Sequence, residues 1–255
     1  MLGPVLDVIF PRSCAGCGRG PWPFCDGCRL TLVPLSAPWC ERCGLPSERR
    51  LATCRECPPG ELSQARAPFL FTGPMRSAIH RLKFAGWKAV AAALGEAMAS
   101  VVEERPDAVT WVPLSRRRLS DRGFDQARAL ALVVARRLDR PAVRLLSRAG
   151  DTSPQARRSG AERRARMGGA FRQEGTAPPL VLLVDDVLTT GSTAAACARV
   201  LLEAGAGKVA LVTAARAASA PPPPAILGSG SRPGLWLPGG GSLDSRCQPQ
   251  AKRPT

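Results

Sequence analysis

The segment from residue 180 to residue 193 constrains the fold of this chain more than any other stretch. It reads Leu-Val-Leu-Leu-Val-Asp-Asp-Val-Leu-Thr-Thr-Gly-Ser-Thr. The pattern predicts a buried strand over Leu180–Val184, a tight loop around Gly191 and a helix over Thr193–Ala204. Backbone N–H groups and the helix dipole at such a turn can face a phosphate. We therefore expect a site for a sugar 5′-phosphate, in which Asp185 and Asp186 accept hydrogen bonds from ribose hydroxyls.

Two other interpretations of this segment are open. A strand that ends in Asp-Asp can also hold magnesium in a nucleotidase, but that chemistry needs a phosphate loop of the form G-x-x-x-x-G-K-[ST]. The Gly-Lys pair of this chain is Gly207-Lys208, and Leu202 and Val209 occupy the pattern's remaining fixed positions. The second interpretation is a buried strand without a ligand, although two carboxylates that enter a turn contribute little to stability.

The same segment closely resembles the phosphoribosyl-pyrophosphate (PRPP) loop of the type I phosphoribosyltransferases. The resemblance implies a PRPP site formed by Asp185, Asp186, Val187, Leu188, Thr189, Thr190, Gly191, Ser192 and Thr193. It also implies that Asp185 and Asp186 are the catalytic residues, which hold the ribose while positive charge builds on its ring. Magnesium would bridge oxygens of the departing pyrophosphate.

Eight of the ten cysteines form four CxxC pairs in the first sixty residues. The pairs are Cys14/Cys17, Cys25/Cys28, Cys40/Cys43 and Cys54/Cys57. Two intervening residues allow both sulfurs to reach one ion from a tight turn, which a following Gly18 or Gly44 relaxes. The simplest arrangement is two Cys₄ sites in sequence order, and an interleaved pairing stays open. We expect up to two structural zinc ions to supply folding energy, with disulfides or an iron–sulfur cluster as alternatives.

From Pro68 to Ala218 the sequence alternates between strand and helix patterns. The predicted strands are Pro68–Phe71, Val109–Val112, Ala142–Leu146, Leu180–Val184 and Val209–Thr213. Such alternation predicts an α/β domain with a parallel sheet, whose ligands bind at the carboxyl ends of strands. We expect a double zinc ribbon over residues 1–60 and a type I phosphoribosyltransferase-like domain over residues 61–218. The Pro-, Gly- and Ser-rich residues 219–255 are predicted to be a disordered tail.

The net charge of +16 is concentrated in the middle of the chain. Between Arg105 and Arg172 there are 17 Arg and 6 acidic residues, whereas residues 1–60 carry 7 basic and 5 acidic groups. Such a surplus of positive charge favours binding of pyrophosphate or nucleic acid, including single-stranded DNA. The segment Ser147–Gly175 could close over pyrophosphate through Arg163 and Arg164. A solvated Arg-rich loop without a catalytic role is the alternative.

The sequence also bears on the compartment of the protein. It contains no stretch that approaches the roughly 18 consecutive apolar residues of a membrane span. The first residues, Met-Leu-Gly-Pro-Val-Leu-Asp, lack the basic and long apolar regions of a secretory signal. We expect no membrane insertion and a cytoplasmic location, where clustered thiols indicate metal more often than disulfides.

The order of a cysteine-rich N-terminus and one phosphoribosyl loop resembles the ComF family. Its members pair a double zinc ribbon with a phosphoribosyltransferase-like domain. The resemblance covers about Cys14 to Arg216 and includes the blocks Phe71–Lys83, Val112–Leu114 and Arg122–Ala127. It implies a basic, pyrophosphate-contacting loop to which Pro113, Leu114, Arg122, Arg163 and Arg164 belong.

A few single residues qualify this resemblance. The family usually has Asn where this chain has Asp125 and Arg166, so an amide donor is lost at both positions. The single histidine, His80, is interpreted as an exposed or capping residue rather than a general base. Trp22 and Trp39 are interpreted as shields of the metal units rather than as base-stacking platforms.

Two functional hypotheses follow. The first is a ComF-like protein that binds PRPP, or a related ribose 5-phosphate nucleotide, with magnesium and acts in DNA uptake and natural transformation. Its expected partners are single-stranded DNA and a protein of the DNA-uptake machinery. The second is an active phosphoribosyltransferase of nucleotide metabolism or salvage that has no role in DNA handling. The sequence reveals no pocket for an acceptor base, so whether the chain is an enzyme stays open.

Overall fold

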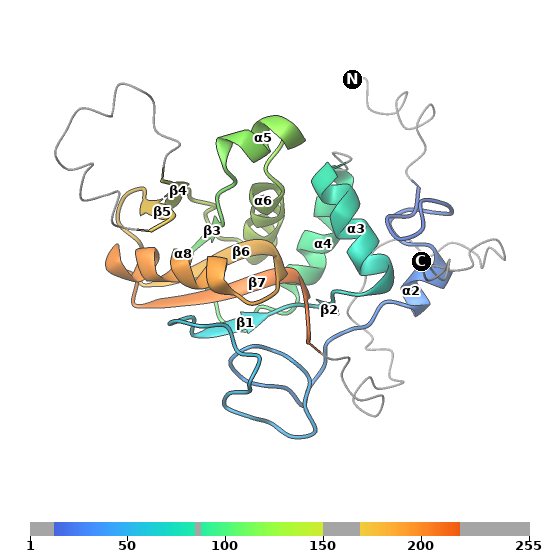
Figure 1. Ribbon diagram of the computed structural model, residues 1–255, viewed down its shortest axis with the longest axis horizontal. Coiled ribbons are helices and arrows are strands. Elements are labelled where there is room, and N and C mark those ends of the chain that lie inside the picture. Colours follow the sequence, from blue (N-terminus) through green and yellow to red (C-terminus); the bar gives the residue numbers. More distant parts are fainter. Residues whose placement is uncertain (1–12, 85–87, 150–168, 220–255) are drawn as a thin grey trace.

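The computed structural model describes residues 13–84, 88–149 and 169–219 (Figure 1). The strands are β1 Gln64–Arg66, β2 Phe69–Leu70, β3 Ala108–Trp111, β4 Leu146–Arg148, β5 Phe171–Gln173, β6 Leu180–Leu188 and β7 Lys208–Arg216. The helices are α2 Asp26–Leu30, α3 Gly73–Phe84, α4 Lys88–Ala99, α5 Arg116–Arg122, α6 Gln126–Leu138 and α8 Ser192–Glu203. The predicted tail lies outside the described residues, except for Ser219.

A parallel sheet forms the centre of the α/β domain. Its order is β1-β7-β6-β3, and β2 also pairs with β7 in a parallel manner beyond the end of β1. The two long central strands, β6 and β7, are paired from Leu180↔Lys208 to Leu188↔Arg216. A separate antiparallel pair is formed by β4 and β5. The fold class predicted from the alternating pattern is thereby confirmed: a small cysteine-rich unit precedes a parallel α/β domain.

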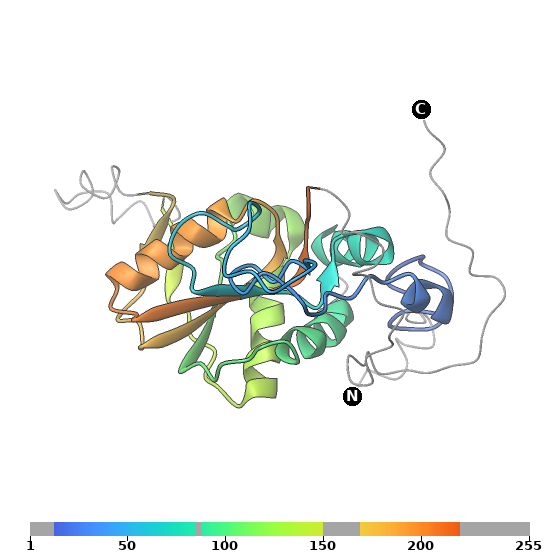
Figure 2. The same ribbon diagram turned by 90° about the horizontal axis from the view of Figure 1, so that it is seen from below.

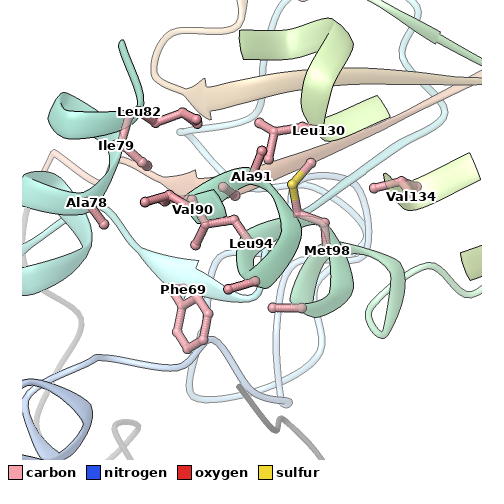
Figure 3. Packing of buried hydrophobic residues seen from close by; sticks show 14 of the residues in the cluster. Phe69, Ala78, Ile79, Leu82, Val90, Ala91, Leu94, Met98, Leu130 and Val134 are labelled. Atoms are coloured by element: carbon pink, nitrogen blue, oxygen red, sulfur yellow. The ribbon is translucent and has the colours of Figure 1, made fainter. Parts of the chain in front are cut away.

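Helices cover both faces of this sheet, as Figures 1 and 2 show. Helices α3, α4 and α6 lie on one face and share a core with Leu182, Val184, Ala210 and Val212. Figure 3 shows side chains of these helices meeting in that core, among them Leu82, Leu94 and Leu130. Helix α8 covers the other face, where it packs on Val181, Leu183, Val209 and Leu211. Over residues 181–184 of β6 and 209–212 of β7, alternate residues therefore point to opposite cores.

Local sequence signals explain where the helices begin and end. The side chain of Ser115 accepts a hydrogen bond from the Arg118 N–H and so caps α5. The α5 helix stops at Gly123, whose φ of 72° is the left-handed value that glycine adopts without strain. The Asp125 carboxylate accepts from the Arg128 N–H and caps α6. Asp and Asn cap helices equally well, so this cap does not require an Asn at position 125.

Several predicted strand bounds were wrong. The strand at Leu180 does not end at Val184 but continues through both aspartates to Leu188, because β7 pairs with it over its whole length. In place of a strand over Ala142–Leu146, the structure has one isolated bridge at Ala142 and the antiparallel strand β4. The three-residue strand β1 and the strand β5 were missed, since both are too short to show a periodic pattern.

Candidate functional site

The two aspartates lie where the central strand β6 loses one of its neighbours. The last pair between β3 and β6 is Trp111↔Val184, and the Val112 N–H donates to the Val184 carbonyl at 3.0 Å. Beyond this point β3 turns away into Pro113, while β6 continues beside β7 alone. Asp185 and Asp186 thus stand at the carboxyl edge of the sheet, the side at which parallel α/β domains bind ligands.

Because successive strand residues point to opposite faces, the two carboxylates have different surroundings. Asp185 lies on the α8 face and lines a small pocket of about 50 Å³ with the following loop. The other residues of this pocket are Val187, Leu188, Thr189, Thr190, Gly191, Ser192, Thr193, Ala194, Leu211 and Thr213. The structure therefore brings Asp185 together with seven of the other eight residues predicted for the PRPP site, all but Asp186.

Asp186 lies on the opposite face of β6 and is 5% exposed. Its Oδ1 forms an ion pair with Lys83 Nζ of α3 at 3.0 Å, and its Oδ2 accepts a hydrogen bond from Gln126 Nε2 of α6 at 3.1 Å. The sequence analysis assigned no role to Lys83 or Gln126. Both lie in blocks that carry the family resemblance, which is the signal that could have found them.

Burial raises the pKa of Asp185 to about 8, and the negative charge of Asp186 adds to the shift. The Asp186 N–H, which donates to Asp185 Oδ1 at 2.8 Å, and the Lys83 charge act in the opposite direction. A proton, a cation or a hydroxyl donor would therefore each relieve the desolvation cost of this half-buried carboxylate.

The loop after β6 has the geometry of an anion site. Gly191 adopts φ 79° and stands at the N-cap of this 12-residue helix α8, so the cap residue offers no side chain; of the first-turn N–H groups, that of Ser192 donates weakly to Thr190 Oγ1 at 3.5 Å. Thr189, Thr190, Ser192 and Thr193 are exposed around it. Uncapped N–H groups at the positive end of a helix dipole attract anions such as phosphate.

Basic groups gather at the neighbouring strand end. Pro113 and Leu114, both predicted for the basic loop, line an open groove of about 1060 Å³. Four arginines, Arg116, Arg128, Arg144 and Arg148, line the same groove. Arg148 Nε donates to the Pro113 carbonyl at 3.1 Å and fixes the start of the loop. Arg122 is half-buried at the end of α5, whereas Arg163, Arg164 and Arg166 lie outside the described residues.

The eight clustered cysteines form two groups of four in sequence order. The first group is Cys14, Cys17, Cys25 and Cys28, and the second is Cys40, Cys43, Cys54 and Cys57. Within each group the sulfurs lie within 4.8 Å of one another, for example 3.4 Å between the sulfurs of Cys43 and Cys54. Tetrahedral zinc with Zn–S bonds of about 2.3 Å places its sulfurs about 3.8 Å apart, so both groups fit the ion. The pairing in sequence order is confirmed, and the interleaved pairing is wrong.

The tryptophans near these groups have structural roles. The Trp39 ring lies 5.3 Å from the guanidinium of Arg66, a buried residue of strand β1. Trp22 packs against the core that α3 and α4 share. Both observations agree with the interpretation of these rings as shields. His80 is exposed on α3.

Comparisons with known proteins agree with this architecture. Residues 5–58 match the double zinc ribbon domain. The chain is 29% identical over 133 residues to the competence protein ComFC of Bacillus subtilis (strain 168), covering 48% of this chain and 55% of that protein. It is 33% identical over 130 residues to the DNA utilization protein YhgH of Escherichia coli (strain K12), covering 46% of this chain and 56% of that protein. The chain thus spans about half the length of the curated relatives it matches.

Among solved structures, the allosteric regulatory enzyme of purine biosynthesis aligns with 21% identity over 50% of this chain and 26% of that one, with a TM-score of 0.37.

A double zinc ribbon followed by a parallel α/β domain defines the class of this protein. The matched zinc ribbon and the two relatives, a competence protein and a DNA utilization protein, support assignment of the chain to the ComF family. Within residues 13–84, 88–149 and 169–219, no helix has the length and apolar character that a membrane span requires.

Proposed function

We propose that this protein binds PRPP, or a related ribose 5-phosphate nucleotide, together with magnesium at the carboxyl end of β6. The observation that carries the proposal is the pocket in which Asp185 meets the loop of residues 187–194. It combines a half-buried acid with a helix N-terminus whose cap residue is a glycine. The 5′-phosphate would accept hydrogen bonds from the loop N–H groups, and the Asp185 carboxylate would accept them from a ribose hydroxyl.

The residues also fit a magnesium ion that arrives with the ligand. Mg²⁺ prefers oxygen ligands and is usually held by one or two carboxylates and by substrate phosphates. Asp185 offers such a carboxylate, and the exposed hydroxyls of Thr190 and Ser192 stand across the same pocket. Asp186 is engaged by Lys83 and Gln126, so it would position the strand and Lys83 rather than serve as a second ligand.

We further propose that the protein acts in the handling of DNA inside the cell, with single-stranded DNA and DNA-uptake proteins as partners. The names of the relatives, a competence protein and a DNA utilization protein, support this role. So does the groove with Arg116, Arg128, Arg144 and Arg148, because clustered arginines beside apolar surface suit a phosphate backbone.

Titration calorimetry of PRPP in the presence of magnesium tests the ligand. Asp185→Asn should weaken binding by about tenfold or more, because a charged hydrogen bond in a buried site is worth roughly 1.5–3 kcal/mol. Asp139→Asn is the matched control: Asp139 is exposed at the far end of α6, and Asn tolerates its φ of 54°. Equal affinity of the wild-type protein and Asp185→Asn would refute the proposed site.

A second experiment separates the DNA role from salvage chemistry. Single-stranded DNA affinity should fall steeply with salt and drop in Arg116→Glu/Arg144→Glu, while Arg49→Glu on the exposed surface of the second metal unit should change it little. Release of pyrophosphate from PRPP, measured across the common bases with and without DNA, should show no base-dependent turnover. Turnover with one base and no affinity for DNA would establish the salvage alternative.

A further inference from the structure

We infer that metal at the second Cys₄ cluster controls the shape of the ligand loop, and that Arg216 is the positioning residue through which it acts. The inference rests on the proposed function, since it concerns the loop that would bind the 5′-phosphate. The second unit is defined as residues 39–58, which carry Cys40, Cys43, Cys54 and Cys57. Metal in the second cluster would thus affect ligand binding as well as folding.

Arg216 connects this unit directly to the loop. It is the last residue of β7 and is 1% exposed. Its Nη1 donates to the carbonyl of Leu188, at 3.2 Å, and to the carbonyl of Thr189. Its Nη2 donates to the carbonyl of Glu56, which lies between the metal-binding Cys54 and Cys57. One buried guanidinium thus holds the start of the ligand loop and the middle of a metal-binding turn.

A second contact joins the same two segments. A Cβ atom at Gly191 would collide with the Cβ of Pro58, the residue that follows Cys57. Gly191 is the N-cap of α8, and its φ of 79° sets the direction of the N–H groups that would face a phosphate. The metal-binding turn therefore presses against the residue on which the anion site depends.

The metal keeps this turn in place. The Cys54 N–H donates to the sulfur of Cys57 at 3.2 Å, and the sulfurs of Cys40 and Cys57 are 3.5 Å apart. This small unit has little apolar core of its own, since its buried cluster consists of Cys40, Cys43 and Leu45. Such units fold only with metal. Without metal the turn would lose its shape. Arg216 would then lose its contact with the Glu56 carbonyl, and Gly191 would lose its contact with Pro58.

The coupling must act in both directions, because linkage between two binding sites is reciprocal. Metal in the second cluster should favour ligand binding, and ligand should slow the loss of metal from that cluster. The first cluster makes a different attachment. Arg81 of α3 donates to the carbonyls of Ala15, at 2.6 Å, and Gly16, at 2.9 Å, so this contact attaches the first unit to a helix and not to the ligand loop. Its metal should therefore be insensitive to ligand.

The experiment uses the full chain loaded with zinc and compares Arg216→Met with Arg66→Met. Arg66 is also a buried strand arginine that contacts the second unit, through the Glu41 carbonyl at 2.7 Å, but its hydrogen bonds run to Glu41, Ala65 and Glu103 rather than to the ligand loop. Both variants should lose stability, whereas only Arg216→Met should weaken PRPP binding, by about tenfold. Pro58→Ala, a milder change, should weaken it by about threefold.

Two further readouts do not measure the affinity for PRPP itself, and the first of them requires no PRPP. Amide hydrogen exchange over residues 188–194 should accelerate when Cys54→Ser empties the second cluster, and should not change when Cys25→Ser empties the first. Zinc release to a chelator dye should be slowed by PRPP at the second cluster alone. Unchanged exchange in both Arg216→Met and Cys54→Ser would overturn the inference. Faster exchange in a protein that binds no PRPP would sustain the coupling and refute the proposed ligand instead.

Discussion

The two Cys₄ units arise from a duplicated sequence pattern but are attached to opposite sides of the ligand site. The first, residues 13–31, is joined to α3 through Arg81, and Lys83 of the same helix holds Asp186. The second, residues 39–58, is joined through Arg216 to the loop beside Asp185. Figure 1 shows the first unit beside α3 and the second beneath β1. The second unit therefore contacts the ligand loop itself, whereas the first contacts the helix that carries Lys83.

Their packing differs as well. Phe24 of the first unit is 1% exposed and belongs to the core that α3, α4 and α6 share with the sheet. The second unit contributes no side chain of this size to either main core, and its Leu45 packs in a cluster of its own. From this contrast we expect the first unit to contribute mainly to stability and the second mainly to the shape of the ligand loop.

Removal of zinc should have the largest effect. Structural zinc contributes about 10–16 kcal/mol to small zinc units at neutral pH, so a strong chelator should unfold residues 13–60 while the parallel sheet persists. Limited proteolysis and metal analysis check this, with two zinc ions per chain before treatment expected from the two Cys₄ groups. A chain that keeps both units folded after complete metal removal would contradict the role of the ion.

Truncation of Phe24 should have the next largest effect. Phe24→Ala should lower the free energy of unfolding by about 3–5 kcal/mol, because it leaves a cavity in the main core. Leu45→Ala should cost about 2 kcal/mol, at the lower end for buried leucines, since its cluster is small. Denaturant unfolding measures both. A larger loss for Leu45→Ala would invert the proposed division between the two units.

The contrast between the two units was only partly predictable from sequence. The CxxC spacing fixes which cysteines can share an ion, and the pattern from Leu180 to Thr193 locates strand, loop and helix, because both depend on neighbours along the chain. The contacts of the site residues do not depend on neighbours along the chain. Lys83 and Asp186 are 103 positions apart, and Arg216 and Glu56 are 160 positions apart. Such contacts are set by the packing of distant segments, which local periodicity does not encode.

The same limit applies to the two aspartates. Their position after an apolar run predicted that they lie together at the end of a strand. The strand instead continues to Leu188, since β7 offers it a partner along its whole length. An extended backbone sends Asp185 and Asp186 to opposite faces, and the sequence analysis treated them as one pair.

The pH dependence of stability should reveal the raised pKa of Asp185. Burial raises the pKa of Asp185 from 3.8 to about 8, so the folded protein holds a proton that the unfolded chain has lost. This group therefore favours the folded state fully below about pH 3.8, and its contribution is lost as the pH rises towards 8. Asp185→Asn stays neutral, and its stability relative to wild type should rise steadily between about pH 5 and pH 8. Unfolding in urea at a series of pH values measures this difference in the free energy of unfolding. Asp139→Asn is the control and should show no such trend.

The smallest effect should come from a charge pair on the surface of the second unit. Arg50 Nη2 and Glu41 Oε1 are 3.1 Å apart, but their side chains are 75% and 50% exposed. Exposed pairs of this kind contribute about 0–1 kcal/mol, because water screens them and ordering two long side chains costs entropy. Arg50→Ala should therefore leave both the zinc content and the melting temperature within error, and PRPP affinity should not change. If Arg50→Ala weakened PRPP binding as much as Arg216→Met, the second unit would influence the loop through its overall charge, and the buried contact at Glu56 would not be the route.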